Sequence, residues 1–469
     1  MGRTLLFEES IQTSVNQLLA NQKTQVGLMI GQLSTSKDFV VHFARCPDPV
    51  DNEVEIEMAS CDDDVIVSKI ENKEKMKKES KLSDVIDTDG IDSKWIVEHA
   101  RQVNRMLTGG MSVLGIYMFC SSDVLSANQS KLRTCLQAVQ RKTEQSKWIR
   151  KAVPHNHRYI VHICASTRKV TCRTLDFHDD QASLQPAEYR YQPFLSNWNF
   201  VSSCVDVNVQ FYVPNSQEAY RNEKKILYAC QQEIEDIWNS YAIAGHKLID
   251  ETKMLADNSK LKKDKKEEGE IKIVLFKKAN SGGDKGYIQY NAANVQVKLV
   301  GSICTRTYLH PKSTYGDAVN ALKVDIIRSL LTRIELLCEE AEVNNFCQVD
   351  EWSLMSPMRV FAPFKDGQIY FSDYIFKDES DEDTLSRFSE LLNISLVKDD
   401  LEYPEKSPDV AEVSMILHGD KIADHHSDVA SELSVLSSQD EPQNNRLVAA
   451  AFAGIAALFA TAMHFFWSD

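Results

Sequence analysis

Short apolar runs separated by polar turns dominate the beginning of the chain. Residues 25–31 and 39–44 are apolar and rich in β-branched side chains, and the polar turn between them predicts a β-hairpin. Residues 47–93 are instead polar, with runs of acidic and lysine side chains that are typical of a solvated loop. The first ordered unit is therefore expected to contain a large polar insert.

A helical pattern follows the polar insert. Over residues 95–107 apolar side chains recur at helical spacing, and Gly109-Gly110 would end that helix. Residues 111–119 form a continuous apolar run, which predicts a buried strand. A second helix is expected over residues 126–142.

In the second half of the chain the runs of apolar residues that predict strands and helices are fewer and longer. Residues 271–276 and 295–307 resemble strands, and the charged stretch before them, residues 253–269, is expected to be an exposed loop. Residues 317–341 predict a long helix. Its apolar side chains recur on one face and are Val319, Leu322, Ile326, Leu330 and Ile334.

Towards the C-terminus the pattern changes from strands to an acidic, aperiodic stretch. Residues 359–364 and 368–376 predict two more strands around the turn dipeptide Asp366-Gly367. From Asp378 the chain becomes acidic, and it loses hydrophobic periodicity before the C-terminal segment. We therefore expect residues 396–445 to form an acidic flexible linker.

The segment LVAAAFAGIAALFATAMHFFW, residues 447–467, contains no formally charged side chain. At about 1.5 Å per residue it would span roughly 30 Å, the thickness of a bilayer core. It is apolar on every face, unlike a buried helix of a soluble domain, and Arg446 precedes it. We predict a tail anchor in the endoplasmic reticulum membrane, with the body in the cytosol. The residues assigned to the anchor are Leu447, Val448, Phe452, Gly454, Ile455, Leu458, Phe459, Phe465, Phe466 and Trp467.

Charge and cysteine content narrow the functional classes. A formal net charge of −15 argues against nucleic acid as a partner, because phosphate binding requires clustered lysine and arginine. The eleven cysteines include no Cys-x-x-Cys pair. An odd, scattered set is typical of a reducing compartment, where buried cysteine behaves as a small apolar residue.

A predicted hairpin at residues 159–165 and 170–177 is rich in histidine and cysteine, which raises the question of a zinc site. In the first strand His162 and Cys164 share one face, while His178 lies near the far end of the second strand. Zinc requires four ligands within about 2.0–2.3 Å of one point. We therefore expect a packed hairpin whose cysteines fill core or half-buried positions.

His155 and His157 have the His-x-His spacing with which MPN-class metalloproteases bind zinc. Those enzymes follow the pair with a serine and an aspartate, whereas Ala165 and Arg168 stand at these positions here. A cation cannot replace a carboxylate ligand. The pair is therefore expected to form a surface turn.

The order of hairpin, long helix and strand is nevertheless similar to the approach of an MPN domain to its metal loop. Residues 114–120 resemble the strand that precedes this loop, but Met118 and Cys120 replace its two histidines. Ser130 and Arg133 stand near the positions where serine and aspartate would follow. We expect an MPN-like domain without metal ligands, and assign no catalytic, cofactor-binding or metal-binding residue.

Several short stretches together resemble the odorant response abnormal protein 4 family. They are Met1-Gly2-Arg3-Thr4, Glu98-His99-Ala100, Gly109-Gly110, Val113-Leu114-Gly115, residues 162–179, Arg359-Val360-Phe361 with Pro363, and Asp373-Tyr374 with Asp378-Glu379-Ser380. The resemblance implies a single-pass protein of the endoplasmic reticulum that assists folding or trafficking of a subset of G-protein-coupled receptors. It also implies a partnership with the ubiquitin-fold-modifier-specific protease, and no catalytic residue carries over.

These observations predict an α/β (α+β) protein of four parts. The parts are an MPN-like domain at residues 1–185, a smaller α+β domain at 186–395, the acidic linker at 396–445 and a transmembrane anchor at 446–469.

The predicted function is that of a non-catalytic membrane adaptor. Its partners would be the protease, receptor cargo and the lipid bilayer, with no cofactor and no nucleic acid. One alternative is a hydrolase that uses a Cys/His pair, such as Cys164 with a distant histidine. Another is a membrane tether or fusion factor, although no sustained apolar heptads precede the anchor.

Overall fold

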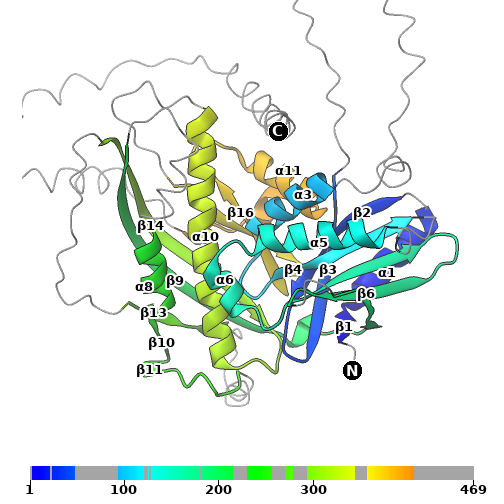
Figure 1. Cartoon of the computed structure of the whole chain (residues 1–469). Coiled ribbons are helices and arrows are strands. Elements are labelled where there is room, and N and C mark those ends of the chain that lie inside the picture. Colours follow the sequence, from blue (N-terminus) through cyan, green and yellow to red (C-terminus); the bar gives the residue numbers. More distant parts are fainter. Residues whose placement is uncertain are drawn as a thin grey trace, which may run out of the picture. The chain divides into compact units, whose positions relative to one another are not determined.

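A mixed eight-stranded sheet is the first large element of the computed structural model (Figure 1). The structure describes residues 3–21, 24–47, 93–120, 125, 128–178, 182–214, 230–255, 270–277, 293–343 and 356–405. In chain order the strands of this sheet are β1 (Thr4–Phe7), β2 (Gln25–Gln32), β3 (Lys37–Arg45), β4 (Ser112–Cys120), β5 (His157–Cys164), β6 (Val170–Asp176), β7 (Gln185–Pro186) and β8 (Glu188–Tyr191). In space they follow the order β7-β6-β5-β4-β2-β3-β1-β8. β1 runs parallel to β3 and β8, and β4 runs parallel to β5, whereas the other neighbours are antiparallel.

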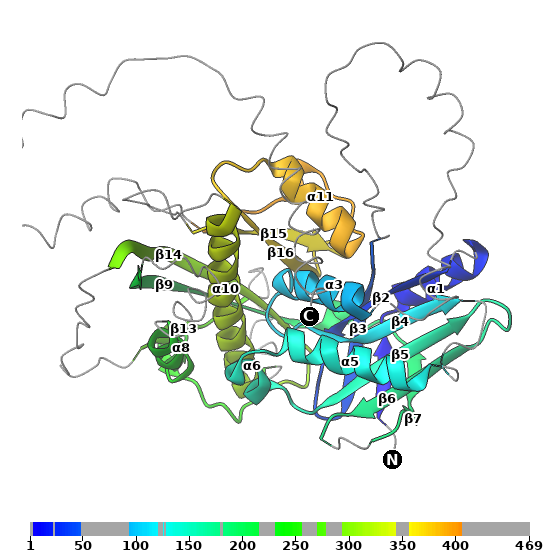
Figure 2. The same ribbon diagram turned by 45° about the horizontal axis from the view of Figure 1, so that its top comes forward.

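Helices cover both faces of this sheet, so the central strands β2 and β4 are buried along almost their whole length. On one face α1 (Glu9–Asn21) packs against side chains of β3, β4 and β5. On the other face α3 (Ser93–Arg105) and α5 (Gln129–Thr143) pack against each other and against β4 (Figure 2). The short helix α6 (Lys147–Ala152) follows α5.

The sequence-based predictions for the hairpins and helices of this half are confirmed. β2 and β3 form the first hairpin, and β5 and β6 form the second. α3, β4 and α5 coincide with the predicted helix, buried strand and second helix to within a few residues.

A long two-stranded ribbon is the frame of the second region. β9 (Asn199–Pro214) and β14 (Ala293–Leu309) pair antiparallel over most of their length, and β12 (Glu270–Lys272) runs parallel to β9. α8 (Gln231–Trp238) and α10 (Tyr315–Val343) bury their apolar side chains against this ribbon. The predicted strands and long helix are thus confirmed, and the five α10 side chains expected to share a face are at most 2% exposed.

A smaller sheet lies at the end of the second region. It contains β10 (Tyr241–Ala244), β11 (Lys247–Leu248) and β13 (Val274–Phe276), with β10 in the middle. A single 3-10 turn, η1 (Leu195–Asn197), leads into β9. Part of β13 also contacts β9, so the small sheet is attached to the ribbon.

The C-terminal elements complete the core of the first sheet. β15 (Met358–Phe364) and β16 (Ile369–Ile375) form the predicted hairpin, whose turn places Asp366 and Gly367 at positive φ. The helix α11 (Asp381–Leu392) and the 3-10 turn η4 (Lys398–Asp400) follow. Val360, Phe371 and Phe388 from these elements belong to the same buried cluster as α3, α5 and β4.

The prediction of a flexible linker from residue 396 is wrong at its beginning. Leu401 is 8% exposed, Glu402 exchanges two backbone hydrogen bonds with Phe361, and Glu405 is ion-paired with Arg333. These polar contacts order residues up to 405 although the segment has no hydrophobic periodicity. Helix α11 was not anticipated either, because its sequence begins with three acidic residues and has few apolar side chains.

Apart from the end of α10, the described residues belong to one compact unit. β8, which lies after the predicted boundary at residue 185, is a strand of the first sheet, and that boundary stays a prediction. Most of the predicted loops at 47–93 and 253–269, the linker after residue 405 and the anchor at 446–469 lie outside the described residues. Within the described part of the chain, no helix is both long and apolar enough to cross a membrane.

Candidate functional site

The histidine- and cysteine-rich hairpin places its side chains on opposite faces of the sheet. His162 contacts Cys120 on the face covered by α3 and α5, whereas Cys172 packs with the cluster on the α1 face. Cys164 is half-buried at the end of β5, and His178 is exposed beyond β6. The hairpin therefore packs as predicted. Nowhere among the described residues do three or more His, Cys, Asp or Glu side chains converge in a way that would hold a metal ion.

A buried Cys–His pair is formed by Cys46 at the end of β3 and His99 on α3. The His99 Nε2–H donates to the carbonyl of Leu391 at 2.9 Å, because a carbonyl can only accept. Nδ1 is then the acceptor for the Cys46 thiol, whose sulfur lies 3.0 Å away. Burial lowers the pKa of His99 to about 4 and raises the pKa of Cys46. This pair is thus a neutral thiol and a neutral imidazole, the opposite of the thiolate–imidazolium pair of a cysteine nucleophile.

His99 and a second, half-buried histidine hold the C-terminal end of α11. His42 on β3 donates from Nε2 to the carbonyl of Leu392 at 2.5 Å, one residue beyond the carbonyl that His99 binds. Asn393 follows with a left-handed conformation, φ 56°, and its side chain accepts from the backbone N–H of Arg45. Carbonyls at a helix end lack partners within the helix, so these donors fasten α11 to the first sheet.

A second Cys–His contact lies deeper in the sheet. Cys120 is 1% exposed, and its sulfur is 3.3 Å from Nε2 of His162, which is 4% exposed. Met118, at the other position aligned with an MPN histidine, is fully buried in the apolar cluster, whereas Ser130 is exposed at the start of α5. The two positions aligned with the MPN histidines, Met118 and Cys120, thus face a closed core.

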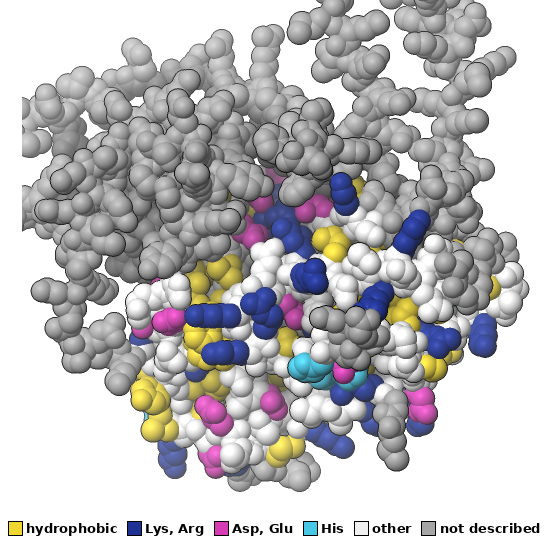
Figure 3. Space-filling model, viewed as in Figure 1, with side chains coloured by type: hydrophobic (Ala, Val, Ile, Leu, Met, Phe, Trp, Pro, Cys, Tyr) yellow, Lys and Arg dark blue, Asp and Glu magenta, His cyan; other side chains and the backbone are white. Residues whose placement is uncertain are grey.

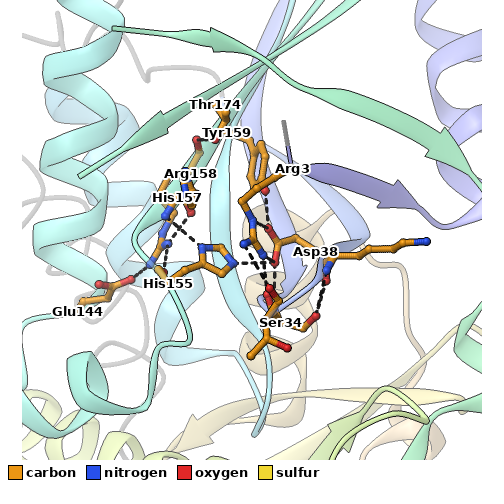
Figure 4. A network of polar contacts seen from close by, with 11 residues as sticks. Arg3, Ser34, Asp38, Glu144, His155, His157, Arg158, Tyr159 and Thr174 are labelled. Carbon is orange, nitrogen blue, oxygen red and sulfur yellow. Dashed lines mark hydrogen bonds and ion pairs between the residues drawn. The ribbon is translucent and has the colours of Figure 1, made fainter. Parts of the chain in front are cut away.

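A polar network centred on the fully buried Asp38 joins three strands (Figure 4). Its carboxylate accepts from Arg3 Nε at 3.1 Å, from His155 Nε2 at 2.9 Å and from the Tyr159 hydroxyl. The backbone N–H of Ser34 is a further donor at 2.9 Å. Burial alone would raise the pKa of Asp38, but the hydrogen bonds from His155 and Arg3 outweigh it, and the pKa lies below its usual value. Asp38 is therefore a buried carboxylate whose charge is balanced.

The prediction of a surface turn at His155 and His157 is wrong for His155. The His155 ring donates to Asp38 through Nε2 and accepts from the His157 backbone N–H through Nδ1, at 3.1 Å (Figure 4). Its side chain is only 11% exposed, because Asp38 draws it into the network. Both ring nitrogens are engaged, so His155 has no free lone pair with which to act as a general base.

Beside this network, a second buried ion pair joins α5 to β5. Arg158 is 1% exposed and contacts the Glu144 carboxylate just after α5 (Figure 4). Arg158 also donates to the backbone carbonyl of His157 at 2.7 Å, and its own carbonyl accepts from the Thr174 hydroxyl. The ion pair joins the end of α5 to β5, and the hydrogen bond from Thr174 joins β5 to β6.

Two buried arginines connect elements of the C-terminal half to one another, and one of them also reaches the segment after α3. Arg359 on β15 forms a two-pronged ion pair with Asp325 on α10, at 2.8 and 3.0 Å, and donates to the carbonyl of Leu107. Arg333 on α10 binds both oxygens of Glu405, at 2.7 and 2.6 Å. Burial would lower the pKa of Arg359, but the Asp325 carboxylate outweighs it and raises the pKa.

The glycine pair after α3 allows the backbone to approach β14 closely. A Cβ on Gly109 would lie 2.0 Å from Oγ1 of Thr307, and one on Gly110 would lie 2.3 Å from the carbonyl of Tyr308. Gly110 also has a φ of 81°, which side chains other than glycine rarely adopt. Gly109-Gly110 and Arg359, which are among the motif residues of the family resemblance, thus lie where elements of the first sheet meet β14 and α10.

An exposed apolar face on the small sheet is the strongest candidate for an interaction surface. Tyr241 lies opposite Phe276, and Ile243 lies opposite both Val274 and Leu248, so these side chains share one face. Tyr241, Phe276, Val274 and Leu248 are between 49% and 70% exposed, and we call this group the β10 face. In Figure 3, hydrophobic side chains gather at the lower left of the visible surface, the side on which Figure 1 draws β10, β11 and β13. Contiguous exposed apolar surface commonly marks a binding site.

Sequence reasoning missed both Asp38 and the β10 face. Asp38 and His155 are 117 positions apart, and no local pattern connects them. The β10 face had a weak signal, the alternation of large apolar residues at Tyr241 and Ile243 and at Val274 and Phe276. That signal was missed because the runs are only three or four residues long.

Most of the chain is similar to proteins of one family. The family model described as "ODR4-like: Odorant response abnormal 4-like" matches residues 27–403. "Protein odr-4 homolog" of Homo sapiens is 29% identical over 423 residues, which is 87% of each chain. "Odorant response abnormal protein 4" of Caenorhabditis elegans is 21% identical over 312 residues, covering 65% of this chain and 64% of its own. Among solved structures, "Crystal structure of UfSP from C.elegans" has a TM-score of 0.40 and 8% identity, covering 84% of this chain and 57% of that one, a likeness too weak to support an argument.

Proposed function

Because the chain belongs to the odorant response abnormal 4-like family, we propose that it is a non-catalytic, membrane-anchored adaptor for a subset of G-protein-coupled receptors. It would assist the folding, trafficking or localisation of these receptors. The name of the nematode relative, which refers to odorant responses, supports this proposal.

The proposed anchor is the apolar segment at residues 447–467. This segment has no formally charged side chain, and its length matches the hydrophobic thickness of a bilayer. We place it in the endoplasmic reticulum membrane, with an MPN-like body on the cytosolic side. An adaptor and its receptor cargo would then share one membrane.

The observation that supports a non-catalytic role is the use of the candidate histidines within the fold. Both ring nitrogens of His99, and both of His155, form hydrogen bonds with partners inside the protein. Cys46 and Cys120, the cysteines that contact histidines, are each 1% exposed. These groups stabilise the junctions between elements and are closed to a substrate.

We propose that the β10 face binds the ubiquitin-fold-modifier-specific protease. Its four exposed apolar side chains lie on a small sheet, and covering such a surface with a partner is favourable by about 25 cal/mol per Å². An apolar surface on the partner is therefore expected to cover this face.

A variant of the anchor tests the central proposal. Two arginines, Ala456→Arg and Leu458→Arg, each cost about 2.5–3.5 kcal/mol at the centre of a membrane helix, so insertion of this alanine-rich segment should fail. The body does not need the bilayer to bury its core. The variant should become soluble, keep its protease partner in co-purification, and fail to restore receptor surface levels in cells that lack the native protein. Full restoration by the soluble variant would refute the membrane-adaptor mechanism.

A pair of substitutions tests the proposed protease surface separately. Tyr241→Ser with Phe276→Ser should abolish co-purification of the protease while the protein stays folded and membrane-bound, since both side chains are more than half exposed. Val397→Ser with Tyr403→Ser is the matched control, because these are exposed large apolar side chains in another region. Equal loss of binding in both pairs would remove the β10 face from the proposal.

One observation favours the hydrolase alternative enough to test it. Hydrogen bonds from the Ser166 and Thr167 side chains lower the pKa of Cys164 to about 7, so a good fraction of this thiol is ionised at neutral pH. If the protein is a non-catalytic adaptor, the substitution Cys164→Ser should leave receptor delivery unchanged. Loss of delivery with normal protein levels, together with labelling of Cys164 by a thiol-reactive probe that depends on a histidine, would favour the hydrolase. Clustering of vesicles by the purified protein would instead favour the tether.

A further inference from the structure

Two cysteines lie directly opposite each other on the long ribbon. Cys204 on β9 is the register partner of Cys304 on β14, and their sulfur atoms are 2.7 Å apart. They are separated by 100 positions in the sequence. Both side chains are on the solvent face of the ribbon, because Cys204 is exposed and the neighbouring Ser203 and Val205 are buried.

The backbone at this position brings the two side chains close together. The N–H of Cys304 donates to the carboxylate of Glu405 at 3.0 Å, and so points away from β9. Cys204 and Cys304 therefore form a non-hydrogen-bonded pair of the antiparallel ladder, the type with the shorter separation of about 4.5 Å between Cα atoms. That separation lies within the range of about 4.4–6.8 Å that a disulfide spans.

We propose that Cys204 and Cys304 are a redox modification site that forms a reversible cross-strand disulfide in exchange with small-molecule disulfides. The Cys204 thiolate attacks one sulfur of the small disulfide, whose S–S bond breaks and releases one thiolate. The Cys304 thiol then gives up its proton and attacks the Cys204 sulfur, which releases the second small thiolate. Two protein thiols are oxidised, one small disulfide is reduced to two thiols, and the released thiolates take up the protons. This proposal goes beyond the adaptor function and does not depend on it.

The hydrogen bond between the two sulfurs assigns the order of attack. It lowers the pKa of Cys204 to about 7, and it raises the pKa of Cys304, which keeps the proton. Cys204 is also the more exposed of the two. Thiolate character and access both favour attack, so Cys204 is the first nucleophile and Cys304 resolves the mixed disulfide.

The surroundings of the pair tolerate the oxidised state. When the disulfide forms, the hydrogen bond from the Cys304 backbone N–H to Glu405 is retained. The 3.7 Å contact from the Cys304 thiol to the carbonyl of Pro404 is lost, because the thiol no longer carries a proton. Glu405 also keeps its ion pair with Arg333. Oxidation thus changes one contact of the segment at residues 404–405 and leaves the other contacts in place.

The test uses the full-length protein in detergent, equilibrated with reduced and oxidised glutathione in graded ratios and then trapped by alkylation. Peptide mapping by mass spectrometry should show a Cys204–Cys304 disulfide, with the loss of two hydrogen atoms. Cys304→Ser should accumulate glutathione on Cys204, because no second thiol resolves the adduct, whereas Cys204→Ser should leave Cys304 largely unmodified. Cys164→Ser is the matched control and should not change the formation of the disulfide.

The wild-type result decides the outcome. At ratios at which Cys304→Ser is glutathionylated, the wild type should carry the internal disulfide and little glutathione, since the second thiol acts at a high effective concentration. If the wild type instead carries glutathione on Cys204, or keeps both thiols alkylatable, the proposal is overturned. Circular dichroism of the two serine variants confirms that they are folded, which is expected because these positions face solvent.

Discussion

At Cys46 and His99 the hydrogen-bond pattern determines the protonation state of both side chains. The carbonyl of Leu391 requires a proton on Nε2 of His99, so the other ring nitrogen must accept from the thiol. A protonated ring would have only the weakly accepting sulfur as a partner for Nδ1–H, and its charge would be buried. The same residue types would form a catalytic pair at an open surface, but here the pair is buried and His99 binds the end of α11. His99 and His42 together bind the last two carbonyls of α11, and we call these two histidines the clamp.

The clamp makes the stability of the protein dependent on pH. Burial lowers the pKa values of His42 and His99 to about 4, against the usual 6.5 that both regain on unfolding. Between these pH values the unfolded chain binds more protons than the folded protein, so the free energy of unfolding must fall as pH falls from about 6.5 to 4. The expected slope is about 1.4 kcal/mol per pH unit for each histidine.

Urea unfolding at several pH values in this window measures the slope. His42→Gln with His99→Gln keeps an N–H donor for each carbonyl and removes the titration of these two groups, so it should reduce the slope. His178→Gln, at an exposed histidine, should leave the slope unchanged. His157 and His310, whose pKa values burial also lowers, should keep part of the slope. A slope that the double substitution does not reduce would contradict the assignment to the clamp.

The Arg359–Asp325 pair is the second feature with a large expected effect at the scale of single residues. Both side chains are at most 1% exposed, so Asp325→Ala leaves an unpaired charge in the core. The expected loss is about 3–5 kcal/mol in the free energy of unfolding, measured by chemical denaturation. Glu188→Ala breaks the exposed pair with Arg190 and should cost about 0–1 kcal/mol. Similar losses in both variants would mean that the core pair is not buried as described.

At the scale of elements, α11 shows how much of the fold was readable from the sequence. The β2–β3 hairpin and α10 were predictable because their apolar residues follow one periodicity over many positions. α11 buries only Thr384, Phe388 and Leu392, which is too sparse a stripe for a confident assignment. The sequence does carry a start signal for this helix, since Ser380 and Asp383 form a capping box.

The candidate site was less predictable than the elements that carry it. The clamp partners His42 and Leu392, and the network partners Asp38 and His155, are brought together only by the tertiary fold. A sequence pattern reports which side chains share a face within one element, but it does not report which elements meet. The sequence therefore drew attention to His155, His162 and Cys120, without their partners or their structural role, and it gave no sign of His42 or Cys46.

The capping box of α11 leads to a prediction for this element. The Ser380 side chain accepts from the backbone N–H of Asp383, and the Asp383 carboxylate accepts from the backbone N–H of Ser380. Ser380→Ala should therefore cost about 0.5–2 kcal/mol, and hydrogen exchange should rise in α11 while β2 and β4 stay protected. Ser389→Ala, at an exposed position within the same helix, should be neutral or slightly stabilising. Uniform acceleration of exchange across the sheet would show that α11 is not an independent unit.

At the scale of the whole molecule, the proposed topology makes a prediction about glycosylation. Asn128 and Asn393 both stand in the Asn-x-Ser pattern, which is modified only in the lumen. A cytosolic body should leave both asparagines bare, whereas an acceptor sequence appended after Asp469 should be modified in cells, as a glycosidase-sensitive shift. The same extension on the Ala456→Arg/Leu458→Arg variant should stay unmodified. Glycosylation of Asn128 in the native protein would reverse the proposed orientation.

The clamp on α11 also has a consequence for the synthesis of the protein. His42 and the carbonyl that it binds are 350 positions apart. At about 5–20 residues per second, a ribosome needs roughly 18–70 seconds to make the chain between them. During that time the apolar side chains of α3 and β4 that later contact β15, β16 and α11 have no cover. A nascent chain of this protein therefore has to be protected from aggregation for most of its translation, and a product that stops before α11 should be retained by chaperones rather than fold.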